Sequence, residues 1–183
     1  GLRGHRYDKP LAAMSAYLDG INKSAPAGEL PVVVAALGPK MLALSAAKSR
    51  GAVPYNVTPQ HTAQAAAILG PSKWLAVEQK VTIETDPAKA RSLGRKELSR
   101  YMVLPNYRNN WLRLGFTEEQ INQSDPAFVD AVVAWGTAEQ IRDRVQSHYD
   151  AGATHVCIQP LSPDPERPRA LDWDALEALS PNA

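Results

Sequence analysis

The sequence has little of what several classes of protein require. Its 183 residues include one cysteine, Cys157, so no internal disulfide can form and the composition fits a reducing cytosol. The 20 lysines and arginines are balanced by 19 acidic residues, which leaves no basic excess for nucleic acid or an anionic membrane. No apolar run reaches the ~20 residues of a membrane span, and residues 1–7 lack an apolar signal core. We therefore expect a cytoplasmic protein that binds neither nucleic acid nor membrane.

Motifs for metal ions and nucleotides are also missing. Neither G-x-G-x-x-G nor G-x-x-x-x-G-K-[ST] occurs. The four histidines show no paired ligand spacing, and there is no pair of cysteines. We predict no metal site. Cys157 stands among apolar neighbours in an expected strand, so we interpret it as an inert core thiol.

Helix and strand signals alternate along the chain, and 44% hydrophobic residues suffice for one core, so we expect a single domain over 1–183. The expected strands are 31–36, 52–57, 74–85 and 155–160. The expected helices are 10–21, 40–50, 59–69, 88–102, one that opens at the capping box of 137–140, and 172–179. Segment 105–116 is aromatic-rich, and we expect it to be less regular.

This alternation predicts an α/β fold with parallel strands joined by right-handed crossovers. Two architectures fit: an open doubly wound sheet, and part of a (β/α)8 barrel. Four clear strands cannot close an eight-stranded barrel, which typically needs about 250 residues. The pattern by itself leaves both architectures open.

The strongest local signal is the turn formed by Leu37, Gly38, Pro39, Lys40 and Met41. A buried strand passes through glycine directly into a helix, so free backbone N–H groups are expected at the carboxyl end of the strand. These amides and the positive end of the helix dipole favour an anion, and Lys40 adds a charge. We therefore predict that this turn binds a phosphate group of a cofactor or substrate. The alternative is a tight turn before an ordinary capped helix.

Other polar residues follow the next strand, at the edge where α/β folds place their sites. Tyr55 and Asn56 are candidates to hydrogen-bond a ligand, whereas Thr58 is better explained as a helix cap. His61 can either donate to a ligand or lie at the surface, and we favour the surface. Lys80 could form a Schiff base if desolvated, but its alternation with Val81 favours an outward-facing side chain.

Segment 106–111 gathers amide, guanidinium and aromatic groups. Tyr107, Arg108 and Asn109 suit a polar, planar or anionic ligand, so we predict that they bind substrate. The same residue types are enriched at protein interfaces, which is an equal alternative. No residue is a convincing general acid or base, so catalytic residues are not assigned.

The sequence resembles the bacterial luciferase-like monooxygenase family. The resemblance covers nearly the whole chain in order and is carried by these segments: 6–14, 36–44, 51–62, 84–87, 104–110, 114–117 and 151–159. Each motif is moderately specific, and their order strengthens the match. They are most similar to the branch that uses the deazaflavin coenzyme F-420 rather than FMN.

The resemblance implies a partial TIM-type barrel, roughly its second half, and hydride or oxygen chemistry on a small-molecule substrate through a flavin-like ring. It implies that 38–41 holds the phosphate-bearing tail of coenzyme F-420, or alternatively of FMN, and that 55–57 and 106–110 border the coenzyme or substrate. The family's first four strands have no counterpart here. Because exposed strand edges invite pairing, we expect a homodimer or pairing with a missing N-terminal half. A non-catalytic half-barrel that binds or interacts is the alternative function.

Overall fold

The computed structural model describes residues 8–24, 31–164 and 170–180, and within them it contains one parallel sheet. Its strands are β1 (Val33–Val34), β2 (Gly51–Ala52), β3 (Trp74–Thr82), β4 (Val133–Trp135) and β5 (His155–Pro160). β1 pairs with β2 and β2 with the start of β3. β4 and β5 lie on opposite edges of the end of β3, since Lys80 has register partners in both. Four of these strands, β1, β2, β3 and β5, thus follow one another around the sheet in chain order.

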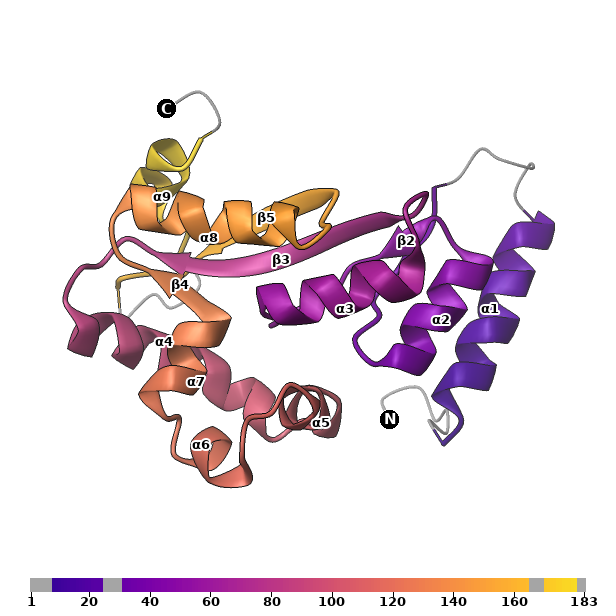
Figure 1. The fold of residues 1–183 in the computed structure, drawn as a ribbon, viewed down its shortest axis with the longest axis horizontal. Helices are drawn as coiled ribbons and strands as arrows, with labels where there is room; N and C mark the ends of the chain where they lie inside the picture. Colours follow the sequence, from indigo (N-terminus) through magenta and orange to yellow (C-terminus); the bar gives the residue numbers. More distant parts are fainter. Residues whose placement is uncertain (1–7, 25–30, 165–169, 181–183) are drawn as a thin grey trace.

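Helices connect the strands, as parallel pairing requires. They are α1 (Pro10–Ser24), α2 (Pro39–Lys48), α3 (Pro59–Leu69), α4 (Pro87–Met102), α5 (Pro105–Arg113), α6 (Glu118–Asn122), α7 (Pro126–Val132), α8 (Ala138–Asp150) and α9 (Trp173–Ala178). In Figure 1, β3 runs along the middle of the molecule, with α1, α2 and α3 beside its first half and α4 to α7 beside its end. The α/β fold class with parallel strands is therefore confirmed.

The helix starts follow the expected side-chain caps. Thr58 accepts a hydrogen bond from the amide of His61, and Asp86 accepts from the second and third residues of its helix. Thr117 and Thr137 form complete capping boxes with the glutamines three positions on. These contacts satisfy N–H groups that have no partner inside the helix.

Several expected elements differ from the structure. Segment 105–116, expected to be less regular, contains the helix α5, and α7 and β4 were not predicted. α5 forms because Trp111 is fully buried against Phe128, a contact 17 residues away in sequence that no local pattern reveals. β1 and β2 have two residues each, shorter than 31–36 and 52–57. Asn56 has φ of 55°, which no strand accommodates.

The two faces of β3 have different environments. Leu75 and Val77 pack into one core with residues of α1, α2 and α3, and Val81 packs against Ile141 of α8. A second core surrounds Trp111 where α4, α5, α6 and α7 meet. The opposite face of β3 carries Lys80, which is buried, so its expected outward orientation is wrong. The face toward α3 and α8 is thus mainly apolar, with Gln79 bonded there to His148, whereas the other face carries the buried Glu78 and Lys80.

The close approach of β2 to β3 requires glycine at position 51, which can be tested by substitution. A Cβ on this buried glycine would lie 1.9 Å from the carbonyl oxygen of Trp74. We expect Gly51→Ala to lower the free energy of unfolding by at least about 2 kcal/mol, because backbone must move. Chemical denaturation measures this. Gly20→Ala is the control, since nothing lies within 4 Å of its Cβ position, and it should stabilise α1 by roughly 0.5 to 1 kcal/mol. Equal stability of Gly51→Ala and the parent chain would contradict the close approach.

Candidate functional site

The turn after β1 keeps fewer free amides than the sequence suggested. Gly38 is the N-cap of α2, and Pro39 at the first helical position has no N–H. The amides of Met41 and Leu42 both donate to the Gly38 carbonyl at 3.0 Å. Among the described residues this leaves the amide of Lys40 as the one N–H of the first turn without a backbone partner. An anion at this turn therefore needs side chains as well.

Arg113, at the end of α5, supplies a cation at the turn. Its Nη2 atom lies 3.4 Å from the position that a Cβ on Gly38 would occupy, and it donates to Oδ1 of Asn110 at 3.2 Å. Glycine at position 38 thus leaves room for the guanidinium. The sequence analysis did not single out Arg113, because α5 was not expected to fold back over the end of β1.

His61 also belongs to this region and not to the surface. It is 2% exposed, and its Nε2 atom lies 2.8 Å from the carbonyl oxygen of Leu37. Burial lowers the pKa of His61, the Leu37 carbonyl partly offsets this, and the charge of Arg113 lowers the pKa further. The expected surface position is wrong because His61, in the first turn of α3, reaches back across to the end of β1.

Four buried side-chain atoms have no hydrogen-bond partner among the described residues: Nδ2 and Oδ1 of Asn56, Nδ1 of His61 and Nδ2 of Asn110. His61 contacts Leu37, and Asn110 contacts Arg113, so two of these atoms belong to side chains around the turn after β1. Asn56 lies toward Glu78, to which its backbone N–H donates, and its carbonyl accepts from the indole of Trp111 at 3.0 Å. A buried polar group without a partner costs about 1–3 kcal/mol. Two of them near one cation therefore indicate a place for a polar or anionic ligand.

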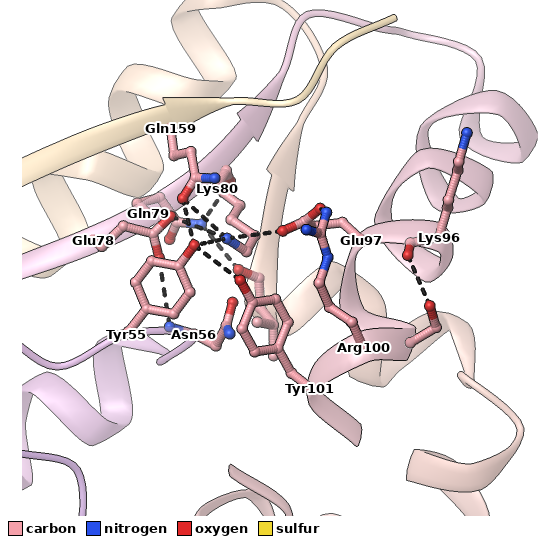
Figure 2. A network of polar contacts seen from close by, with 12 residues as sticks. Tyr55, Asn56, Glu78, Gln79, Lys80, Lys96, Glu97, Arg100, Tyr101 and Gln159 are labelled. Carbon is pink, nitrogen blue, oxygen red and sulfur yellow. Dashed lines mark hydrogen bonds and ion pairs between the residues drawn. The ribbon is translucent and has the colours of Figure 1, made fainter. Parts of the chain in front are cut away.

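A second polar cluster surrounds the ammonium group of Lys80, which has no solvent exposure. The Nζ atom lies 2.7 Å from Oη of Tyr55, 3.1 Å from Oε1 of Gln159, and 3.3 and 3.4 Å from carboxylate oxygens of Glu97 and Glu78. Figure 2 shows these side chains converging from three strand ends and α4. We call this set, together with Tyr101, the Lys80 network.

Aromatic rings complete the enclosure of Lys80. Its Nζ lies 4.1 Å from the ring centre of Tyr55 and 5.3 Å from that of Tyr101, distances at which a cation is attracted to the ring face. Four oxygen acceptors share the three ammonium protons of Lys80. A Schiff-base lysine must reach the carbonyl carbon of its substrate, and this amine is enclosed by its acceptors and by two rings. The geometry therefore argues against a Schiff-base role for Lys80.

The phenols of the network are held protonated. Tyr55 donates to Gln159 at 2.6 Å, and Tyr101 donates to Tyr55 at 3.2 Å. Burial is the main cause that raises the pKa of Tyr55 and raises that of Tyr101 to about 12. Burial also raises the pKa of Glu78, against the charge of Lys80. The network thus holds its phenolic protons in internal hydrogen bonds, and we identify no general base in it.

The predicted substrate residues separate in the structure. Tyr107 packs its ring edge-on against Tyr101, next to the Lys80 network. Arg108 faces α6, where it donates to Asn122 at 2.8 Å and pairs with Glu118. Asn109 is exposed. The substrate role of these three residues stays a prediction, and of the three only Tyr107 approaches the polar clusters.

Other expectations about chemistry can be placed as well. Cys157 is exposed on β5, so its interpretation as a core thiol is wrong. Its strand has one sheet partner, β3, and its side chain alternates with the inward-packed Val156 and Ile158. The described residues include no group of three or more histidine, cysteine or acidic side chains placed to hold a metal ion. Within the same part of the chain no helix has the length and apolar character needed to cross a membrane.

Comparison with solved structures places this geometry in a known fold. An F420-dependent secondary alcohol dehydrogenase in complex with an F420-acetone adduct superposes with a TM-score of 0.57 at 17% identity, over 84% of this chain and 50% of that one. Coenzyme F420 dependent tetrahydromethanopterin reductase from Methanopyrus kandleri gives 0.53 at 16% identity, over 83% and 49%. Apo-MsnO8 gives 0.56 at 16% identity, over 94% and 60%. No protein-family model matches the sequence, and no curated protein is significantly similar to it.

These likenesses show the fold. The chain has the architecture of part of these proteins and spans about half the length of the first two. The partial-barrel fold that the resemblance implied is therefore confirmed. In a barrel the carboxyl ends of the strands form the face that carries the active site. Both polar clusters of this chain lie at that end.

Removal of the buried cation tests the Lys80 network. Lys80→Met leaves the buried Glu78 without its counter-ion and leaves Glu97 paired with Arg100 alone, so we expect it to lower the free energy of unfolding by about 3–5 kcal/mol. Lys48→Met is the control, because Lys48 pairs with Asp19 at 2.7 Å where both side chains reach solvent, and we expect a loss below about 1 kcal/mol. Denaturant unfolding compares the two. Similar losses in both variants would contradict a network that depends on Lys80.

Proposed function

We propose that this chain is part of a luciferase-like oxidoreductase or monooxygenase that uses coenzyme F-420, with FMN as the alternative coenzyme, on a small-molecule substrate. The observation that carries the proposal is the group of unpartnered polar atoms and one cation around the turn after β1. Two of the matched structures are described as F420-dependent, which supports the choice of coenzyme. The coenzyme supplies hydride or oxygen chemistry, and the protein binds and orients it.

The residues around the turn suit the phosphate-bearing tail of such a coenzyme. The amide of Lys40 and the guanidinium of Arg113 are donors, and the Nδ2 atom of Asn110 has no partner within the described residues. Arginine presents its donors in a planar fork that matches phosphate oxygens. An oxyanion here would satisfy buried groups that the chain leaves unpaired.

The Lys80 network supports a second role at the same end of the sheet. It brings the hydroxyl groups of Tyr55 and Tyr101 together with the amide of Gln159, each on a different element. We propose that this network borders the ring of the coenzyme or the substrate. Tyr107 packs against it, which agrees with the role predicted for Tyr107. The network would form part of the wall around a bound molecule, with its own charges and phenolic protons paired internally.

The chain offers two strand edges for a partner. Within the described residues β1 pairs with β2 alone and β5 pairs with β3 alone. An unpaired edge presents a row of N–H and C=O groups to another strand. We propose that a second copy of the chain, or an N-terminal half-barrel, covers these edges. Light scattering measures the outcome, and a well-folded monomer would contradict this part of the proposal.

The second candidate is a non-catalytic half-barrel that binds or interacts without chemistry. The observation in its favour is the share of the matched structures that the chain covers, 50% and 49% for the two F420-dependent proteins. A chain that binds the coenzyme tail but holds the ring loosely would show affinity without turnover. Binding and activity measured on the same preparation therefore separate the two functions.

Titration with coenzyme F-420 and with FMN, followed by fluorescence, tests the proposal. We expect F-420 to bind, and Arg113→Met to weaken binding about tenfold or more, because a hydrogen bond to a charged group contributes roughly 1.5–3 kcal/mol. Arg91→Met is the matched control, since its guanidinium engages Asp130 of α7, and it should leave affinity unchanged. Gly38→Val should also weaken binding, because the added side chain would displace Arg113. Failure of both coenzymes to bind, or equal losses from the two arginine variants, would refute the phosphate site.

A further inference from the structure

We propose that His61 takes up a proton when an oxyanion binds at the turn after β1, so that anion binding at this site is coupled to pH. The inference rests on the proposed function, because it concerns the same site and adds how that site responds to its ligand. It is carried by the position and the hydrogen bonds of one buried imidazole ring.

The hydrogen bond to Leu37 fixes which nitrogen of His61 carries the proton. A carbonyl oxygen only accepts, so Nε2, at 2.8 Å from it, must be the donor. In the neutral ring the other nitrogen, Nδ1, is then an acceptor without a proton. Nδ1 is buried and has no partner among the described residues. The ring therefore has one unused position, and protonation there would turn it into a donor.

Burial is the main cause that lowers the pKa of the free His61 ring, and the charge of Arg113 on α5 lowers it further. Among the described residues His148 of α8 is a titratable group that interacts with His61. His148 is itself held neutral, since burial lowers its pKa to about 4. Its ring nitrogens contact the hydroxyl of Thr62 at 2.8 Å and the amide oxygen of Gln79 at 2.9 Å. Burial and the charge of Arg113 therefore oppose protonation of His61 in the absence of a ligand.

An oxyanion reverses this balance. Bound beside Arg113, it offsets the guanidinium charge that opposes protonation, and it offers an acceptor to a proton on Nδ1. The pKa of His61 is then higher in the complex than in the free chain. Between these two pKa values the complex binds more protons, so affinity falls as pH rises. Over that interval the affinity should change by up to about tenfold per pH unit.

Sulfate is a suitable probe because it does not titrate near neutral pH, so any pH dependence comes from the protein. Calorimetry between about pH 5 and 8, in two buffers that differ in ionisation enthalpy, would measure its binding to the chain. The expected result is weaker binding at higher pH with uptake of up to one proton per sulfate. NMR of the imidazole should show the His61 pKa moving upward on addition of sulfate.

Two histidine variants separate the outcomes. His61→Gln retains a donor toward Leu37 but cannot titrate, so sulfate should bind with little pH dependence and no proton uptake. His148→Gln removes the neighbouring ring, and the pH dependence of sulfate binding should persist. Binding by the parent chain without proton uptake would overturn the role of His61 and leave the phosphate site standing. Absence of binding by both sulfate and coenzyme F-420 would overturn the site itself.

Discussion

The ammonium group of Lys80 is shut off from solvent, and a buried charge is tolerated only where acceptors surround it. Tyr55 from the end of β2, Gln159 from β5, Glu97 from α4 and Glu78 from β3 itself supply them. The contacts of Tyr55, Gln159 and Glu97 tie three other parts of the chain to the carboxyl end of β3. The ion pair of Lys80 with Glu97 therefore helps to hold α4 across this end of β3. The position of α4 in turn sets where α5 begins.

That path places the second polar cluster. α5 follows α4 directly and packs Trp111 against the core formed with α6 and α7, while the indole N–H bonds the Asn56 carbonyl. The same helix then ends at Arg113 beside Gly38. α5 packs in the core formed with α4, α6 and α7, and its last residue, Arg113, places a guanidinium beside the end of β1. The proposed anion site therefore forms only when α5 packs against the turn between β1 and α2.

The two clusters differ in how completely they are satisfied. The Lys80 network pairs its ammonium, carboxylates and phenols with one another, so it is rigid and needs no ligand. Around Gly38, by contrast, side-chain atoms of His61 and Asn110 remain without partners in the described chain. Unpaired buried groups beside a paired network suggest a division of roles: one cluster holds the architecture and borders a ring, and the other receives a charged tail.

Local sequence determined much of the secondary structure. Proline and glycine placement, caps such as Thr58 and Asp86, and the boxes at Thr117 and Thr137 fix helix ends through contacts within a few residues. Parallel strands and the Gly38 turn could also be predicted, because alternation and turn chemistry are local. The burial of Lys80 and His61 and the approach of Arg113 were decided by the tertiary structure alone. Their partners are distant in the chain, 24 residues from His61 to Leu37 and 79 from Lys80 to Gln159, and no short-range pattern records which groups will meet.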